Sequence, residues 1–346
     1  MTSLCRLLGI DIPLIQAPMA GVQGSRMAVA VSAAGALGSL PCATLGLDAL
    51  GEELRVLGAH ARGPVNVNVF CHVQPPVDLE RERAWRLALS PYYCEHGIDP
   101  DTIPTGPGRV AFNHETADVL EAFRPAVVSF HFGLPSPDLV ARVKSWGSRI
   151  LSSATTVDEA RWLEARGVDA VIAQGVEAGG HRGMFLSGDV STQVGTLALV
   201  PQVVRAVRIP VIAAGGIADP AGVAAAMRLG ASGVQVGTAY LLCPEATTTA
   251  VHRAALSSDA ARHTALTNLF TGRPARGIVN RLMRDLGPMS PLAPAFPLAT
   301  SALAPLRTSA EGKGSGDFSP LWSGQNASGC RALPAAELTR ELAQGI

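Results

Sequence analysis

Short apolar runs alternate with amphipathic stretches from about residue 12 to about residue 250. Eight of the runs have the length and the Val and Ile content of buried parallel strands. Between them, segments such as VDEARWLEARG and DPAGVAAAMRLG carry apolar residues three and four positions apart, which indicates helices. The pattern therefore predicts repeated βα units around a parallel sheet. The predicted strands are residues 13–19, 36–40, 64–70, 126–130, 149–154, 169–174, 210–215 and 233–237.

Eight βα repeats predict an α/β protein with a (βα)8 TIM barrel. The competing architecture is a doubly wound open sheet. That fold gives no reason for as many as eight repeats, and the GxGxxG turn typical of its first βα unit is absent from this chain.

Two regions interrupt the βα pattern. About forty residues separate the third predicted strand from the helical segment HETADVLEAF, far more than an ordinary βα loop holds. The excess predicts an inserted segment at about residues 71–110, which we interpret as a lid. Beyond about residue 265 the chain becomes rich in Pro, Gly and Ser but retains Phe296, Phe318 and Trp322. We therefore expect residues 1–265 to form the barrel and residues 266–346 to cover its mouth, with a partly disordered tail as the alternative.

Composition excludes several classes of protein. The chain has 28 Lys and Arg against 28 Asp and Glu, so the basic surface of a nucleic-acid-binding protein is not expected. The most apolar stretch, residues 27–40, is too short to span a bilayer, and the first residues lack the features of a secretory signal. These observations predict a cytoplasmic protein that is not embedded in a membrane.

The six cysteines are scattered and form no CxxC pair, and no HExxH or similar ligand spacing occurs. The sequence therefore predicts reduced thiols and no bound metal.

Glycines follow the seventh and eighth predicted strands, where many TIM barrels bind phosphate. Gly215 and Gly216 lie in AAGGIAD, and Gly237 and Thr238 lie in GVQVGTAYL. Backbone N–H groups in such loops can approach an anion closely. Tight turns alone would also explain either loop, but the two together favour a ligand that carries a phosphate.

The ends of earlier predicted strands supply groups that suit a flat heterocycle. Met19 lies in QAPMAG, Asn66 and Asn68 share one face of the third strand, and Gln174 ends the sixth. Their amides could bind the edge of a ring, although a buried Asn or Gln often bonds local backbone instead.

The segments QAPMAG, NVNVF, HFGLP, AQGVEAGGHRG, AAGGIAD and GVQVGTAYL together resemble the nitronate monooxygenase family, formerly called 2-nitropropane dioxygenases. The resemblance covers about residues 10–245, with weaker support from LWSGQ near the end. It implies a TIM barrel that binds FMN without a metal. It also implies oxidation of alkyl nitronates, with nitroalkanes as further candidates, by O2 to carbonyl compounds and nitrite.

The resemblance assigns roles to individual positions. His181 matches the family's catalytic histidine, and His131, Met19, Gly21 and Phe296 are expected in the substrate pocket, with Phe296 where relatives carry a tyrosine. We expect Arg182 to be a solvated loop residue. The flavin contacts fall on Ala17, Pro18, Met19, Asn68, Gln174, Gly179, Gly180, Gly215, Gly216, Gln235, Gly237 and Thr238.

Histidine chemistry agrees with this assignment. An imidazole with a pKa near neutrality can remove the acidic proton of a nitroalkane, and its charged form can hold a nitronate anion. A loop histidine that bonds local backbone is the alternative for His181, and a hydrogen-bonded core histidine is the alternative for His131.

Two other functions fit the same pattern. One is an FMN-dependent reductase that takes hydride from NAD(P)H and passes it to a quinone or an enoyl thioester. The other is a barrel that binds a flavin or a phosphate ligand without catalysis. The sequence leaves the oligomeric state open, and a homo-oligomer is compatible with it.

Overall fold

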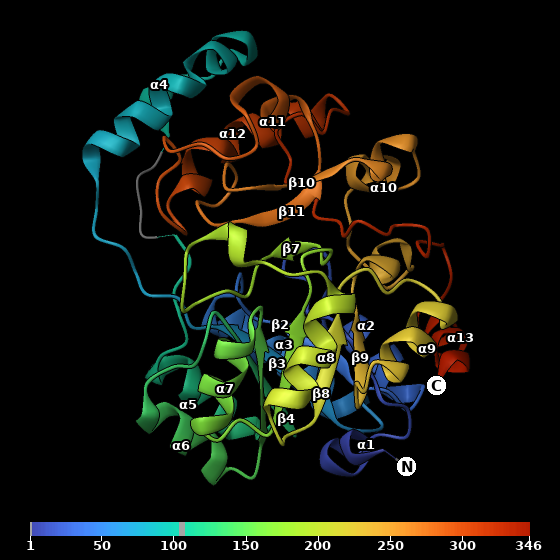
Figure 1. Ribbon diagram of the computed structural model, residues 1–346. Coiled ribbons are helices and arrows are strands. Elements are labelled where there is room, and N and C mark those ends of the chain that lie inside the picture. Colours follow the sequence, from blue (N-terminus) through green and yellow to red (C-terminus); the bar gives the residue numbers. More distant parts are fainter. Residues whose placement is uncertain (1, 104–107) are drawn as a thin grey trace.

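The computed structural model describes residues 2–103 and 108–346. Eight parallel strands pair in the order β1-β9-β8-β6-β5-β4-β3-β2. A parallel bridge between Ile15 and Leu37 joins the two ends, so the sheet closes into the predicted (βα)8 barrel (Figure 1). The strands are β1 (Leu14–Gln16), β2 (Gly38–Pro41), β3 (Val65–Phe70), β4 (Val127–His131), β5 (Arg149–Ala154), β6 (Ala170–Gln174), β8 (Val211–Ala214) and β9 (Gly233–Val236).

Each of the eight predicted strands overlaps one of these strands, and β2 and β4 extend one residue beyond the predicted bounds. The strands could be predicted because alternate apolar residues face two different cores. Ile15 and Leu151 point into the barrel, where they meet Leu4 and Leu8 of helix α1 (Ser3–Leu8). Leu14 belongs to the larger core between the strands and the surrounding helices. Helix α1 therefore covers the end of the barrel that lies opposite the cap described below (Figure 1).

In the described ranges, seven helices that follow barrel strands surround the barrel. Thr156 is typical of their starts, since its side chain accepts the N–H of Glu159 and satisfies the first turn of α7. They are α2 (Ser25–Ala33), α3 (Leu47–His60), α5 (His114–Phe123), α6 (Pro137–Ser145), α7 (Val157–Ala165), α8 (Thr196–Ala206) and α9 (Pro220–Arg228).

A second layer, which we call the cap, lies above the carboxyl ends of the strands (Figure 1). It combines the segment after β3 with the segment after residue 263, since Trp85 Nε1 donates to the Ala299 carbonyl at 3.4 Å and the Tyr93 hydroxyl to the Ala302 carbonyl at 2.7 Å. These residues belong to one buried apolar cluster. The elements of the cap are α4 (Leu79–His96), β10 (Thr264–Thr267), β11 (Ala275–Ile278), α11 (Arg281–Leu286) and α12 (Ala299–Gly312).

The cap reaches the barrel through a small antiparallel sheet in the order β10-β11-β7, which the sequence pattern did not predict. Strand β7 consists of Gly180–His181 and is the next strand along the chain after β6. In this sheet His181 pairs with Ala275 of β11. A residue of the barrel loop is thus held by the cap.

The C-terminal segment does not lie wholly over the barrel mouth as expected. Helix α13 (Ala335–Leu342) returns to the side of the barrel beside α2 and α9, and the Thr339 hydroxyl shares a 2.8 Å hydrogen bond with Tyr240. The domain division at about residue 265 remains a prediction, and residues 104–107 of the expected insert lie outside the described chain. The remaining short elements are α10 (Ala250–Leu256), η1 (Pro100–Thr102), η2 (Val190–Thr192), η3 (Thr238–Leu242), η4 (Asp259–Arg262) and η5 (Ala343–Gly345).

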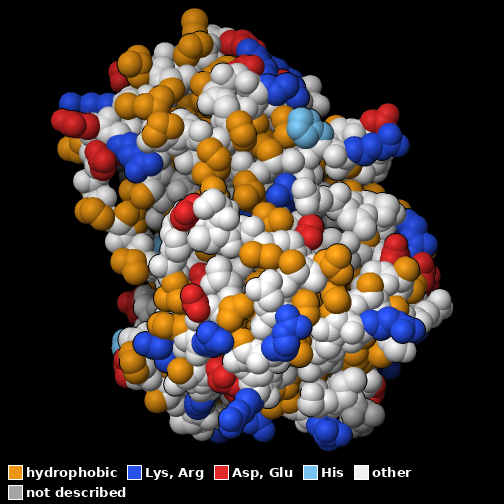
Figure 2. All heavy atoms as spheres, viewed as in Figure 1, with side chains coloured by type: hydrophobic (Ala, Val, Ile, Leu, Met, Phe, Trp, Pro, Cys, Tyr) orange, Lys and Arg blue, Asp and Glu red, His pale blue; other side chains and the backbone are white. Residues whose placement is uncertain are grey.

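Figure 2 shows acidic and basic side chains of the barrel and the cap interspersed on the face that it presents. Within residues 2–103 and 108–346, no helix combines the length and the hydropathy needed to cross a membrane.

Candidate active site

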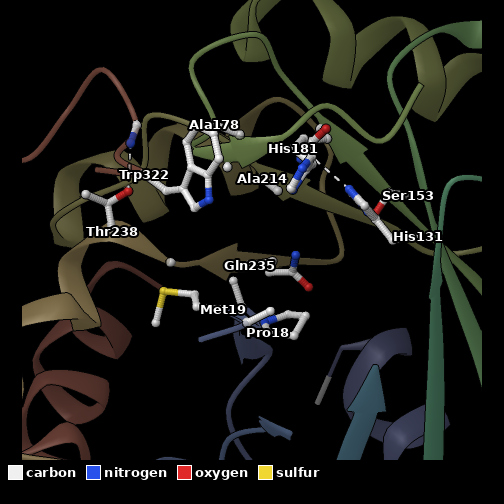
Figure 3. A pocket seen from close by; sticks show the side chains of 18 of the residues that line it. Pro18, Met19, His131, Ser153, Ala178, His181, Ala214, Gln235, Thr238 and Trp322 are labelled. Carbon is white, nitrogen blue, oxygen red and sulfur yellow. Dashed lines mark hydrogen bonds between the residues drawn. The ribbon is translucent and has the colours of Figure 1, made fainter. Parts of the chain in front are cut away.

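One cavity opens between the carboxyl ends of the barrel strands and the cap (Figure 3). His131, His181 and all twelve residues expected to contact a flavin line it. Gly21 and Phe296, which were expected in the substrate pocket, do not line this cavity. The twelve are Ala17, Pro18, Met19, Asn68, Gln174, Gly179, Gly180, Gly215, Gly216, Gln235, Gly237 and Thr238.

The cavity has the form of a slot. Pro18 and Met19 at the end of β1 form one wall, and the Trp322 indole lies opposite them (Figure 3). Gln235 extends from β9 between these walls, and its buried Oε1 makes no hydrogen bond with the described residues. A buried acceptor without a partner suggests that a ligand supplies one.

Asn66 and Asn68 behave differently although they share a face of β3. Asn68 lines the cavity, and its Nδ2 donates to Ser129 Oγ at 2.9 Å. Asn66 is fully buried and does not line the cavity, and its Nδ2 donates to Ser39 Oγ at 3.0 Å. Asn66 lies two residues nearer the start of β3 than Asn68, which places it deeper in the barrel than the cavity.

Gly215, Gly216, Gly237 and Thr238 line the cavity directly after β8 and β9, and we call them the glycine cradle. Thr238 lies on the side of the cavity away from His131 (Figure 3). Gly215 has a φ of 117°, and a Cβ there would lie 2.8 Å from Thr196 Oγ1, so this position requires glycine. Thr238 Oγ1 accepts the N–H of Gly324 at 3.0 Å, which leaves its own proton free to donate to an anion.

The start of helix α9 lies directly after the first of these glycine loops. The Asp219 carboxylate already accepts the Gly222 N–H at 2.7 Å. One N–H group of this helix terminus is therefore not available to a phosphate.

A C-terminal coil that spacing did not identify completes the cradle. Asn326 Nδ2 donates to the Gly216 carbonyl at 3.0 Å, and the Gln325 N–H donates to the Glu177 carbonyl at 2.9 Å. Trp322, Gly324 and Asn326 all line the cavity. Only the weak resemblance of LWSGQ pointed to this segment.

His181 is held at three points. Its backbone pairs with Ala275, and its carbonyl accepts His131 Nε2 at 3.2 Å and Gln174 Nε2 at 3.0 Å. Its ring nitrogen Nε2 lies 2.9 Å from Thr271 Oγ1 in the cap. The imidazole is thus fixed at the cavity wall by the barrel and the cap together (Figure 3).

Both histidines of this wall are neutral near pH 7. Burial first, and then the positive charges of Arg109 and Arg273, hold the pKa of His181 well below its usual range. Burial likewise lowers the pKa of His131 to about 3. Since a carbonyl can only accept, His131 Nε2 carries the proton, and its Nδ1 accepts from Ser153 Oγ at 3.1 Å.

His131 and His181 form the side of the cavity that we call the histidine wall. Phe296 packs against His181 without lining the cavity. Its ring centroid lies 5.3 Å from that of His181 and 5.4 Å from that of Phe132, and its side chain is buried. The Arg109 guanidinium lies 5.9 Å from the Phe296 centroid and lines the cavity itself. Sequence reasoning missed Arg109, because nothing in the sequence marked the short segment around it.

The prediction for Arg182 was wrong. Its side chain is fully buried rather than solvated, and its guanidinium donates to the carbonyls of Gln174 and Gly175, each at 2.7 Å. A third bond reaches Gln193 Oε1 at 2.9 Å. The chain turns back after β7, so Arg182 lies beneath the loop and satisfies the carbonyls at the end of β6.

The cavity-lining residues and the described chain around them contain no group of three or more His, Cys, Asp or Glu side chains arranged to hold a metal ion. Arg109 is the only Arg, Lys, Asp or Glu among the described lining residues. The Arg109 guanidinium therefore gives this lining a positive charge.

The chain matches a family model described as nitronate monooxygenase over residues 1–345. It belongs to the nitronate monooxygenase family. A relative from Pseudomonas aeruginosa named nitronate monooxygenase is 46% identical, over 99% of this chain and 98% of its own length. Another of that name from Paraburkholderia phytofirmans is 43% identical, over 99% and 96%. The solved structure of a nitroalkane oxidase from Streptomyces ansochromogenes is 38% identical with a TM-score of 0.87, over 98% and 96%.

The family membership predicted from the motifs is thus confirmed, and this member of the nitronate monooxygenase family is a flavin-dependent oxidoreductase. A flavin fits the residues that are present. The slot suits a flat ring, Gln235 Oε1 offers an acceptor to a ring N–H, and the glycine cradle offers N–H groups to a phosphate.

Proposed function

We propose that the protein uses FMN and O2 to oxidise alkyl nitronates, and nitroalkanes, to carbonyl compounds and nitrite. The observation that carries the proposal is the convergence of His181, Arg109 and the glycine cradle on one cavity. One end of this cavity suits a phosphate, and the other suits a small organic anion.

In this proposal the glycine cradle and the Thr238 hydroxyl bind the phosphate of FMN. Asn68, Gln174 and Gln235 lie where amides can bind the polar edge of the ring, with Pro18 and Met19 along one face. Bound FMN would supply electron acceptance from the nitronate and reaction with O2.

The chain's own residues handle protons and charge. A neutral His181 can accept the carbon-bound proton of a nitroalkane, and the resulting anion is stabilised by the imidazolium and by Arg109. A nitronate supplied as substrate is already an anion, so the same groups only bind and orient it. His131 and Gln174 hold the His181 carbonyl and thereby keep the ring in place.

The test uses the purified yellow protein. Under anaerobic conditions, addition of propyl-2-nitronate is expected to change the flavin spectrum, and oxygen is then expected to restore it with release of nitrite. An unchanged flavin spectrum with the nitronate, together with rapid bleaching by NAD(P)H, would contradict the proposal and favour the reductase. A protein that does not retain FMN would exclude both functions.

The homo-oligomer and the cytoplasmic location stay predictions.

A further inference from the structure

We propose that Thr271 is a positioning residue that holds His181 in the tautomer protonated on Nε2, so that Nδ1 is the atom that accepts the substrate proton. Thr271 lies in the cap, in the loop between β10 and β11, far from His181 in the sequence. Its Oγ1 lies 2.9 Å from His181 Nε2.

A second partner of the threonine favours one direction for this hydrogen bond. The Thr271 hydroxyl has one proton, and it is placed to donate that proton to the Arg273 carbonyl at 3.5 Å. A carbonyl oxygen can only accept. With the hydroxyl proton on that carbonyl, the hydroxyl oxygen accepts from His181 Nε2, and this is the arrangement that the proposal assigns.

The other ring nitrogen is left open to the cavity. His181 lines the cavity, and its Nδ1 makes no hydrogen bond with any residue in the described ranges. A neutral imidazole with its proton on Nε2 carries a lone pair on Nδ1. Flipping the ring would break the bond to Thr271, while the paired backbone and the bound carbonyl keep the residue itself from moving.

The loop that carries Thr271 is fixed by close packing. The Gly272 N–H donates to the Asn268 carbonyl at 2.7 Å. Gly272 has a φ of 89°, and a Cβ there would lie 2.0 Å from the Pro294 carbonyl oxygen, so only glycine allows the approach. Thr271 is itself buried. The hydroxyl is therefore presented to the imidazole by a rigid segment.

Burial is the main cause of the low pKa of His181, and the charges of Arg109 and Arg273 lower that pKa further. The titratable side chains of His72 and His131 face the same ring and oppose its protonation only when they are themselves charged. The inference rests on the proposed function for one step only. In that step the carbon-bound proton of a nitroalkane moves to Nδ1, the C–H electron pair stays on the substrate as the nitronate, and His181 becomes an imidazolium.

The tautomer can be read without turnover, by long-range proton–nitrogen NMR spectra of the holoenzyme labelled with 15N-histidine. His181→Asn identifies the signals. We expect a protonated Nε2 and an unprotonated Nδ1 in the natural protein, a mixture in Thr271→Val, and recovery in Thr271→Ser. Thr267→Val is the matched control, because Thr267 is a buried threonine nearby whose hydroxyl accepts the Leu269 N–H instead.

Protonated Nδ1 in the natural protein would overturn the inference, and so would an unchanged tautomer in Thr271→Val. A mixture in Thr267→Val would assign the effect to general loosening of the loop. The spectra decide even if the variants fold poorly, because the natural protein alone reports the tautomer.

Kinetics give a second measurement. Loss of one neutral hydrogen bond corresponds to roughly a three- to tenfold change, so we expect kcat/KM for nitroethane to fall by that factor in Thr271→Val. The value for ethyl nitronate, which needs no proton removal, should change by less than about twofold. Equal losses on both substrates would contradict the role of Thr271. Absence of nitronate turnover in the natural protein would instead refute the proposed function and leave the NMR result standing.

Discussion

The two ends of the cavity are built from different parts of the protein. The glycine cradle uses backbone groups at the ends of β8 and β9, which are neighbours both in the sheet and along the chain. The histidine wall uses side chains from β4 and β7, and it depends on Thr271 and Ala275 of the cap. The cradle itself is thus local, although the C-terminal coil packs against it, whereas the histidine wall is assembled from distant segments.

This difference decides how each end responds to change. Backbone donors lose their positions when a side chain is introduced where none fits, so the cradle is sensitive to substitution at glycine. The histidine wall is sensitive to any substitution that alters charge, tautomer or orientation. Substitutions at the two ends should therefore separate cofactor binding from chemistry.

The largest separation is expected for His181→Asn. Removal of a general base costs roughly 10²- to 10⁴-fold, so kcat/KM for nitroethane should fall by that factor. The flavin content, measured from the absorbance ratio of the purified protein, should not change. Loss of flavin in this variant would show that the two ends are not independent. His131→Asn is the control for the loss of an imidazole at the same wall.

Gly215→Ala should have the opposite effect. A non-glycine residue at a φ of 117° is strained, and the added methyl group would lie 2.8 Å from Thr196 Oγ1. Such strain costs on the order of 1–3 kcal/mol, so the affinity for FMN should fall about tenfold or more. Titration of apoprotein with FMN measures the loss. Gly46→Ala is the matched control, because no atom lies within 4 Å of a Cβ there and its φ is negative.

The fully reconstituted Gly215→Ala protein should retain its rate with nitronate. A large fall in kcat at saturating FMN would mean that the cradle also orients the reacting groups.

The histidine wall, but not the cradle, should make stability depend on pH. The pKa of His131 is about 3 in the folded protein and about 6.5 when the chain unfolds. Between these values the unfolded state takes up a proton that the folded state refuses. This contribution is therefore fully present above about pH 6.5 and is lost as the pH falls towards 3.

His131→Gln should make the pH dependence shallower by about 1–2 kcal/mol between pH 7 and pH 5. Denaturant unfolding at the two pH values measures this difference. His252, whose pKa is lowered to about 4 by burial, titrates in the same direction and keeps the slope from vanishing. An unchanged slope in His131→Gln would indicate that His131 is already solvated in the folded protein.

The contrast between the two ends also explains what the sequence could predict. Eight strands follow from apolar alternation, and the cradle follows from glycines placed after consecutive strands, since both features are local. The twelve residues that the motif resemblance assigned to flavin contacts, and both histidines, line one cavity. Those residues still describe only half of the site.

The other half depends on contacts that no local pattern encodes. Strands β7, β10 and β11 are short, and the pairing of His181 with Ala275 joins segments far apart in the chain. Arg182 was placed in solvent because arginine is usually exposed, whereas three unsatisfied oxygen acceptors draw it into the interior. Phe296 was expected in the pocket, but it packs behind His181. At both positions tertiary packing, rather than the usual exposure of the residue type, decides where the side chain lies.

The smallest effect is expected at Arg109. Removing its charge should affect substrate binding at the histidine wall but not FMN binding at the cradle. Arg109 is the cation that lines the cavity and lowers the pKa of His181. In Arg109→Met the pKa of His181 should rise. As the pH is lowered, the rate with a neutral nitroalkane should therefore begin to fall at a higher pH than in the natural protein. The KM for a nitronate anion should rise about three- to tenfold, because one partly exposed charge is lost.

Rates with nitroethane against pH, and KM for ethyl nitronate at two ionic strengths, measure these two effects. Arg109→Lys should restore most of both, because the charge matters more than the shape of the guanidinium at this partly open position. FMN affinity should stay constant in both variants, since the cradle lies at the other end of the cavity. An equal loss of FMN affinity would mean that Arg109 acts on the cofactor. The cradle and the histidine wall could then not be treated as separate parts of the cavity.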